Sequence, residues 1–319
     1  MLKLRGGRTL YYGKGDVLSY RTYAAPLAVK PIPESPYAGD ENIIFAHNIK
    51  FSVSGESLLT SFTEGDNSQV VATDSMKNFI LRETSNYGGC TTEGLLAFLA
   101  ERFLERYPHI DELAIEADRL PFSAVTVADG GGWSASDLVF RRSHNEHAGA
   151  SLRWRREDGG AKLLKQESAL SRVQLIKVRG SSFYGFVRDE YTTLPESHDR
   201  PLFIFLDIFW TYENAADAID GGRGKYVPSE QVHDLAHTVF HSVHSPSIQS
   251  LIYAIGQRIL VSFPQLSEVR FESNNRTWET VVEPADPASA GVYTEPRPPY
   301  GFQGFTLTRE DLSEGNGRT

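Results

Sequence analysis

The pattern of apolar and polar positions predicts two strands and a loop in the first part of the chain. Within residues 43–54 apolar and polar side chains alternate, and a period of two is typical of a half-buried strand. Residues 9–24 are rich in Tyr, Val and Thr, and the glycines at 13 and 15 predict a bend or bulge in that strand. The four prolines within 26–42 predict a surface loop between the two strands.

Helical patterns come next. Val70 and Val71 are β-branched and predict the end of a strand, whereas Thr73 to Ser75 are residue types that cap helices. A first helix is therefore expected over 75–82. Thr92 is expected to cap a longer helix that ends near residue 107, because apolar side chains recur there on one face. That face consists of Leu95, Leu96, Leu99, Phe103 and Tyr107.

The second half of the chain has the same order of elements. Strands are expected at 112–118, 123–128, 136–142 and 149–155, and again at 173–178 and 202–211. Two further helices are expected, one from Pro228-Ser229 to about Ser242 and one starting at Ser245-Pro246, with Pro in the first helical position. Strands at 268–272 and 301–307 close the chain.

This order of strands and helices predicts an α+β fold with helices on one face of an antiparallel sheet. Such a helix needs an apolar stripe, and in the last long helix that stripe consists of Ile248, Leu251, Ile252, Ile255 and Ile259. The two halves show no repeat that can be aligned residue by residue, so the repetition lies in the order of elements.

Composition narrows the choice of partners and compartment. The chain has 319 residues, 23% of them charged, with a net charge of −9. An acidic protein of this kind is not expected to bind nucleic acid or an anionic membrane. A single cysteine allows no internal disulfide, which indicates a reducing compartment. No apolar run is long enough for a signal peptide or a membrane span, so a cytoplasmic location is expected.

Histidines form the first candidate site. His233, His237 and His241 recur every four residues and share a helix face, a spacing that can hold zinc. However, the zinc-protease motif has Glu where this chain has Asp234, and no distant third ligand stands out. The glycine clusters fit neither the dinucleotide fingerprint nor the phosphate loop. The sequence therefore predicts no metal and no cofactor.

Two candidate residues lie in the first half. Thr73 and the adjacent Asp74 place a hydroxyl and a carboxylate among the free N–H groups of a helix start, which suits an anion or a reactive group. The alternative is an ordinary helix cap. Lys14 follows an aromatic residue and a glycine inside a strand, where burial would lower its pKa. The alternative is an ordinary solvated lysine.

Five candidates in the second half suit one planar ligand. Phe183 offers a stacking face and Arg200 a fork of donors, although either is also an ordinary core or salt-bridge residue. Gln249 offers a donor and an acceptor on one amide, and the backbone N–H of Ile248 adds a further contact. Asn275 lies in a polar stretch, and the alternative interpretation of that stretch is an ordinary turn at the end of a strand. Together these groups suit a planar ligand with hydrogen-bonding groups on its edges.

The stretches that carry these residues resemble the motifs of the urate oxidase (uricase) family, in its Bacillus-type branch. The resemblance runs from Tyr12 to about Leu312, and the motifs occur in the family's order. They are Tyr12 to Val17, Val70 to Asn78, Phe183 to Leu194 with Asp199-Arg200, Ser247 to Gln249, and Asn274 to Trp278.

The resemblance implies cofactor-free oxidation of urate by O₂ in purine catabolism, giving 5-hydroxyisourate and hydrogen peroxide. Lys14 and Thr73 would remove a proton from urate, and Thr73 and Asn275 would hold O₂ and then water. The substrate-binding residues implied are Thr73, Asp74, Phe183, Arg200, Ile248, Gln249 and Asn275. Many family members have a histidine where this chain has Thr277. Since Thr cannot act as an acid or base near neutral pH, the role of residue 277 stays open.

The family fold implied is a tandem of T-fold domains, at 1–165 and 166–319. Such chains pair into barrels that stack into a homotetramer, with active sites between subunits. Lys14 and Thr73 would come from one chain and the other site residues from its neighbour. Two alternatives stay open. One is a T-fold enzyme acting on pterins or GTP, which typically needs zinc or an acidic anchor residue where this chain has Gln249. The other is a non-catalytic purine-binding protein.

Overall fold

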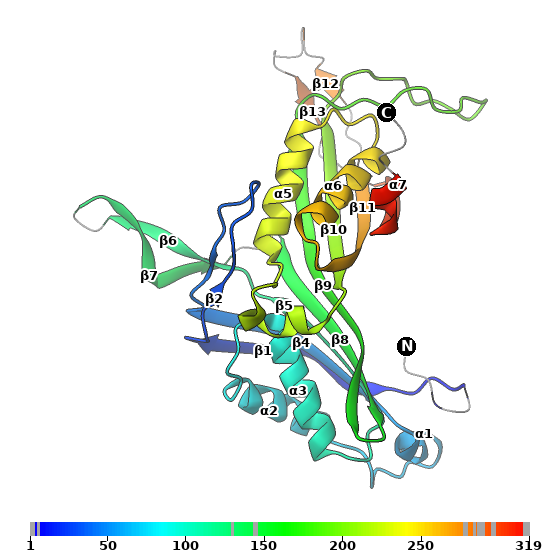
Figure 1. Cartoon of the computed structure of the whole chain (residues 1–319). Helices are drawn as coiled ribbons and strands as arrows, with labels where there is room; N and C mark the ends of the chain where they lie inside the picture. The colour runs from blue at the N-terminus through cyan, green and yellow to red at the C-terminus, as the bar shows by residue number, and fades with distance from the viewer. Residues whose placement is uncertain are drawn as a thin grey trace. The chain divides into compact units, whose positions relative to one another are not determined.

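The chain divides into two compact units in the computed structural model (Figure 1). The structure describes residues 4, 7–128, 131–142, 146–276, 280–282, 285, 291–294 and 298–314. Unit 1 takes the described residues of Met1–Lys30, Tyr37–Ala169 and Thr211–Val227. Unit 2 takes those of Pro31–Pro36, Leu170–Trp210 and Pro228–Thr319.

Unit 1 is built on a sheet in the order β1-β4-β5-β8-β9. The pairs β1–β4, β4–β5 and β5–β8 are antiparallel. The strands are β1 (Tyr12–Thr22), β4 (Ile44–Ser54), β5 (Glu112–Arg119), β8 (His147–Glu157) and the first part of β9 (Gly160–Lys177). Smaller two-stranded sheets pair β2 (Leu27–Ala28) with β3 (Gly39–Asp40) and β6 (Phe122–Ala128) with β7 (Trp133–Arg142).

Two long helices pack on this sheet, α2 (Thr73–Thr84) beside β1 and α3 (Thr92–Arg106) beside β5 and β8. The apolar face of α3 is buried as its spacing predicted, since Leu95, Leu99 and Phe103 have no exposed surface. Phe103 contacts Phe51 of β4 edge to face, with ring centroids 4.7 Å apart. The shorter helices are η1 (Glu56–Leu58), α1 (Leu59–Thr63), α4 (Ala216–Ile219) and η2 (Gly221–Arg223).

Unit 2 continues from β9 in the order β9-β10-β11-β14. Its helices α5 (Ser229–Ser242) and α6 (Ile248–Ser262) lie side by side, and α6 packs on β11 and β14 (Figure 1). Along β10 (Leu202–Tyr212) buried and half-buried residues alternate strictly, so one face of that strand supplies core. The other elements are β11 (Leu266–Arg276), β12 (Thr280–Val282), β13 (Val292–Tyr293), β14 (Tyr300–Thr308) and α7 (Glu310–Glu314).

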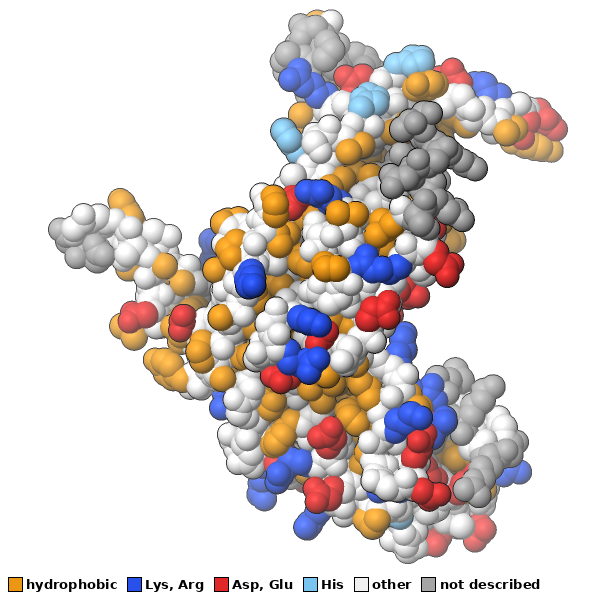
Figure 2. Space-filling model, viewed as in Figure 1, with side chains coloured by type: hydrophobic (Ala, Val, Ile, Leu, Met, Phe, Trp, Pro, Cys, Tyr) orange, Lys and Arg blue, Asp and Glu red, His pale blue; other side chains and the backbone are white. Residues whose placement is uncertain are grey.

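The α+β class predicted from the sequence is confirmed, with antiparallel strands and covering helices in each unit. No helix among the described residues is long and apolar enough to cross a membrane. On the face seen in Figure 2, basic and acidic side chains are interspersed, so the net negative charge does not produce a surface of one sign there.

Three local predictions were wrong. Val70 and Val71 do not end a strand, because the backbone of Val71 bonds the hydroxyl of Tyr12 in place of a neighbouring strand. Helix α2 begins at Thr73, and its N-cap is Ala72, which has no side-chain cap. Helix α6 begins at Ile248 and not at Pro246, because Ser247 is the N-cap and accepts a hydrogen bond from the N–H of Ser250.

A smaller difference concerns the cap of α3. Thr91, not Thr92, is the N-cap, and its hydroxyl accepts a hydrogen bond from the N–H of Gly94 at 3.0 Å. Thr92 is the first helical residue, and its hydroxyl lies 3.0 Å from Nε2 of buried His47. Thr91 and Thr92 are of equal capping tendency, and the contact of Thr92 with His47 distinguishes them.

The two units share equivalent contacts at a constant sequence offset, which the sequence did not reveal. Arg21 of β1 donates to the carbonyls of Thr84 and Tyr87 at the end of α2. Lys177 of β9 donates to the carbonyls of Phe240 and Val243 at the end of α5. The three residues of the second contact each lie 156 positions after their counterparts in the first, because 177 − 21, 240 − 84 and 243 − 87 all equal 156.

Helices α3 and α6 are also related by the offset of 156 residues. Both have 15 residues, both start after a hydroxyl N-cap, and both end at an aromatic residue with φ −121° and ψ 81°. Those aromatic residues, Tyr107 and Phe263, each precede a proline. The repeat therefore places Gln249, at the start of α6, in the position that Glu93 has at the start of α3.

Candidate active site

Lys14 lies on β1, at a point where the strand leaves its regular pairing. It is half-buried and pairs with Phe51 of β4, after which the register shifts before Val17. Asp16, within this bulge, has a positive φ of 52°. The bend expected from the glycines is thus present, and it reorients the strand directly after the lysine.

Gly13 is required by the close approach of β4. A Cβ at this position would lie 1.9 Å from the carbonyl oxygen of Phe51, a distance no side chain can adopt. Glycine therefore allows the backbone that carries Lys14 to lie directly against its neighbouring strand.

Tyr12 connects the lysine strand to the start of α2. Its hydroxyl donates to the carbonyl of Val71 at 3.1 Å and accepts from the N–H of Val71 at 2.9 Å. Burial raises the pKa of Tyr12, so the hydroxyl keeps its proton for the first of these bonds. Tyr12 precedes Lys14 by two residues, and Val71 precedes Thr73 by two, so one side chain brings the two candidate motifs together.

Thr73 and Asp74 occupy the first turn of α2. Thr73 is half-buried, whereas Asp74 is exposed and accepts hydrogen bonds from Lys77 and Asn78 of the same helix. The pKa of Asp74 is lowered chiefly by Lys77, and Lys14 adds a smaller electrostatic contribution. Lys14 is thus close enough to influence this turn, and the carboxylate of Asp74 is engaged within its own helix.

Phe183 and Arg200 are held together in unit 2. Residues 183 and 197 exchange backbone hydrogen bonds of 2.8 and 3.0 Å, and the N–H of Arg200 donates to the carbonyl of Ser181 at 2.7 Å. The guanidinium carbon of Arg200 lies 5.4 Å from the centroid of the Phe183 ring. The guanidinium of Arg200 therefore lies over the ring of Phe183 within this region of unit 2.

One nitrogen of the Arg200 guanidinium, the buried Nε, has no acceptor among the residues that the structure describes. Burial also lowers the pKa of Arg200. A buried donor without an acceptor is costly, by roughly 1–3 kcal/mol. This group is therefore prepared to receive an acceptor from a ligand.

The same loop is joined to the start of α6. The N–H of Ser182 donates to the carbonyl of Ser245 at 2.9 Å, and the N–H of Ser245 donates to the carbonyl of Gly180 at 3.1 Å. Two residues later Ser247 caps α6, so Ile248 and Gln249 form the first turn of the helix. Ile248 is buried and Gln249 is exposed. The backbone thus gathers Phe183, Arg200 and the first turn of α6 in one region of unit 2.

Asn275 lies near the end of β11, where it is half-buried and pairs with Gly301 of β14. A Cβ at Gly301 would lie 2.9 Å from the side-chain oxygen of Asn275, so glycine leaves space for this amide. The guanidinium of the next residue, Arg276, lies 4.8 Å from the ring centroid of Phe205. Thr277 lies outside the described residues.

The candidate residues divide between the units: unit 1 contains Lys14, Thr73 and Asp74, and unit 2 contains Phe183, Arg200, Ile248, Gln249 and Asn275. Sequence reasoning did not assign a role to Tyr12 or to Ser181 and Ser245. Tyr12 was visible inside the lysine motif, and a polar aromatic side chain within a strand is the signal for it. The two serines act through their backbone, which no residue pattern reveals.

Comparison with known proteins supplies independent information on this chain. A family model described as uricase matches residues 48–156 and 166–303. Over 311 residues the chain is 52% identical to the "Uric acid degradation bifunctional protein" of Bacillus sp. (strain TB-90), covering 97% of this chain and 62% of that protein. It is 50% identical over 306 residues to the uricase of Haloferax volcanii, covering 95% and 99% of the two chains.

A solved structure agrees with these sequence matches. The crystal structure of a uricase from Bacillus fastidious resembles this chain with a TM-score of 0.95 at 52% identity. The match covers 98% of this chain and 97% of that one. The similarity therefore extends over both units.

Proposed function

The chain belongs to the uricase family, and on that premise we propose that it oxidises urate with O₂ and water to 5-hydroxyisourate and hydrogen peroxide. The reaction balances, because O₂ takes two electrons and two protons to become H₂O₂ while water supplies the hydroxyl of the product. The observation that carries the proposal is the family match along almost the whole chain. The family model spans Thr73, Phe183, Arg200 and Gln249, whereas Lys14 lies before its first matched residue, in a part of the chain covered by the alignments to whole relatives.

Unit 2 supplies the groups that bind urate. Phe183 stacks on the planar ring, and Arg200 donates in bidentate fashion to adjacent acceptors on one edge. The buried Nε of Arg200, which lacks a protein acceptor among the described residues, supports this role. The amide of Gln249 and the N–H of Ile248 bind the opposite edge, where a donor and an acceptor are both needed.

Unit 1 supplies the proton transfer. Lys14 in its neutral form takes a proton from bound urate through the hydroxyl of Thr73, which leaves an electron-rich dianion. The dianion passes electrons to O₂ directly, so no cofactor is required. Thr73 and Asn275 hold O₂, and afterwards water, above the ring. Asp74 orients the turn through its bonds to Lys77 and Asn78.

The enzyme acts in the cytoplasm, in purine catabolism, as a homotetramer of paired barrels with active sites between subunits. In this arrangement Lys14 and Thr73 act on urate bound by the neighbouring subunit's Phe183, Arg200, Ile248, Gln249 and Asn275. Unit 1 contains the lysine and threonine and unit 2 the binding groups, a division that supports this proposal.

A urate assay with peroxide detection on metal-stripped protein tests the function. We expect loss of urate absorbance and formation of one peroxide per urate without added metal. Loss of activity on chelation would favour the pterin or GTP enzyme of the T-fold class. Saturable urate binding without turnover would favour a purine-binding protein.

A further inference from the structure

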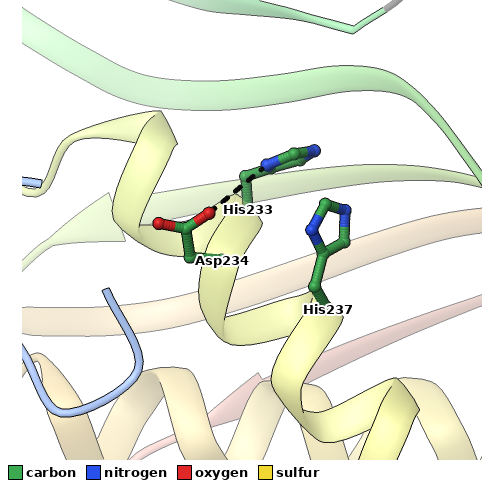
Figure 3. Close-up of side chains that lie close together, drawn as sticks. All are labelled: His233, Asp234 and His237. Carbon is green, nitrogen blue, oxygen red and sulfur yellow. Dashed lines mark ion pairs between the residues drawn. The ribbon is translucent and has the colours of Figure 1, made fainter. Parts of the chain in front are cut away.

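One face of α5 carries three metal-ligating side chains, His233, Asp234 and His237 (Figure 3). In a helix the residue at i+4 lies about 40° from i, and the residue at i+1 lies about 100° from i. The three positions therefore fall within one arc of about 100°, with Asp234 and His237 as i,i+3 neighbours. Among the described residues, these three form a group in which each side chain offers one possible metal-ligand atom close to those of the other two.

The side chains converge in space as their spacing requires. Their ligand atoms all lie within 4.8 Å of one another, and the two imidazole rings are 3.7 Å apart between centroids. Oδ1 of Asp234 lies 3.8 Å from Nδ1 of His233. The side chains of His233 and Asp234 are 24% and 37% exposed, so solvent reaches the group.

The carboxylate of Asp234 is oriented by a residue far away in the sequence. The hydroxyl of Ser35, which is buried, donates to Oδ2 of Asp234 at 2.5 Å. Ser35 belongs to the segment Pro31–Pro36, which is part of unit 2, and Glu34 of that segment forms an ion pair with Arg258 of α6. Oδ2 is thus engaged with Ser35, while Oδ1 faces His233.

We propose that His233, Asp234 and His237 bind one divalent transition-metal ion, with Ser35 orienting the carboxylate from the outer shell. Two imidazoles and a carboxylate are the ligand set that suits Zn²⁺, Co²⁺ and Ni²⁺. Metal–ligand bonds of about 2.1 Å require ligand atoms about 3–4 Å apart, which small side-chain rotations achieve from 4.8 Å. Water completes the coordination on the solvent side.

The proposed metal site is separate from the urate-binding groups of unit 2. Asp234 lies beside the segment that contacts Arg258, whereas Gln249 opens α6 nine residues earlier. Nine residues of helix span about 13 Å. The ion therefore stabilises the attachment of segment Pro31–Pro36 to α5, and it takes no part in urate oxidation. The inference does not depend on the proposed function.

Metal titration of the tag-free, chelator-treated full chain tests the site. We expect one Co²⁺ per chain with the visible absorption of a nitrogen- and oxygen-bound ion, and saturable Zn²⁺ binding by calorimetry. H237A should weaken Zn²⁺ binding by about 10-fold or more, and S35A by about 10-fold, the usual range for ligand and outer-shell changes. H241A, one turn further along α5, is the matched control and should bind as the parent does.

Stability supplies a second measurement in case a variant folds poorly. Saturating Zn²⁺ should raise the unfolding temperature of the parent and of H241A, because an ion that binds the folded state stabilises it by mass action. It should leave the unfolding temperature of H237A and of a second variant, H233Q, unchanged. The proposal is overturned if the parent does not bind saturably, if H237A and H233Q bind like the parent, or if H241A loses binding equally.

Discussion

At the scale of single residues, Tyr12 determines where Lys14 and Thr73 lie relative to each other. Its hydroxyl bonds both backbone groups of Val71: it donates to the carbonyl and accepts from the N–H. No other residue type combines an aromatic body that packs in a sheet with a hydroxyl at that distance from the backbone. Tyr12 therefore acts through the two residues of the proton relay and is a positioning residue.

We expect Tyr12→Phe to lower kcat by about 10- to 100-fold with KM within about 2-fold, because small displacements of reacting groups have effects of that size. Steady-state kinetics with urate measures this, together with the pH profile of kcat. The matched control is Tyr11→Phe, whose side chain is 54% exposed. A rise in KM with unchanged kcat would show that Tyr12 does not position the relay.

Lys14 and Thr73 are tested directly by Lys14→Met and Thr73→Ala. Each should lower kcat by about 10²-fold or more, the usual contribution of general acid–base catalysis, while urate still binds. Stopped-flow turnover and urate binding under anaerobic conditions separate the two effects. Lys162→Met removes an exposed lysine that pairs with Glu157 and serves as the control. Near-normal turnover in both variants would refute the proton relay.

His47 should make the protein less stable in acid. It is fully buried beside Thr92, and burial, followed by the charge of Arg119, lowers its pKa to about 3. The unfolded chain takes up a proton near the ordinary value of about 6.5, so the free energy of unfolding falls as pH decreases from about 6.5 to about 3. This single group can account for a few kcal/mol across that range.

Denaturant unfolding at several pH values measures the contribution of His47. His47→Gln should flatten the acid side of the stability profile, and His109→Gln, which changes a more exposed histidine, should not. Burial raises the pKa of Glu93, which acts in the opposite direction, so the His47 contribution is taken from the difference between the two profiles. Parallel profiles for parent and His47→Gln would contradict the assignment.

At the scale of elements, the 156-residue repeat explains why helices of both units end as they do. A basic side chain from the first strand of each unit satisfies carbonyls at the end of the following helix, Arg21 for α2 and Lys177 for α5. These carbonyls have no partner within the helix, and a cation there is favoured by the helix dipole. Lys177 is half-buried, and this burial lowers the pKa of its ammonium.

We expect Arg21→Met and Lys177→Met each to lower the free energy of unfolding by about 1–3 kcal/mol, because buried carbonyls lose charge-assisted hydrogen bonds. Chemical denaturation measures both variants. Lys162→Met, an exposed lysine on β9, is the control and should change stability by less than about 0.5 kcal/mol. A loss in only one unit would mean that the two caps are not energetically equivalent.

The repeat also reveals a structural difference between the two units. Gln249 is exposed in the first turn of α6, but its counterpart Glu93 is buried in the first turn of α3. Glu93 accepts hydrogen bonds from Ser168 at 2.5 Å and from Tyr226 at 3.1 Å. In unit 1 the side chain at this helix position is therefore bonded by other residues of the protein. In unit 2 its counterpart, Gln249, is the side chain proposed to bind a purine edge.

At the scale of the whole molecule, assembly is the remaining prediction. If the active site lies between subunits, a monomer cannot join the proton relay to bound urate. Size-exclusion chromatography with an activity assay on each fraction tests this, and we expect turnover only in tetrameric fractions. Mixing Lys14→Met with Arg200→Ala chains should restore part of the activity, since hybrid assemblies contain intact sites. Full turnover by a stable monomer would refute the interface site.

The sequence by itself determined the elements with strong local patterns and the residues of the candidate site. The apolar stripe of α6 is an example, because Leu251, Ile255 and Ile259 recur at helical spacing and are all buried. Secondary structure with a clear period depends on neighbours within a few residues, so the sequence contains the necessary information. The motifs around Lys14 and Arg200 were visible for a different reason, their resemblance to the motifs of the uricase family.

Only the tertiary structure decided how those stretches meet. Val70 and Val71 have the composition of a strand, but a hydroxyl 59 residues earlier in the chain takes the backbone of Val71. The repeat was likewise hidden, because Arg21 and Lys177 differ in type and share only a contact. Composition records what each residue favours locally, whereas the position of a helix start or a donor depends on partners that folding brings together from distant parts of the sequence.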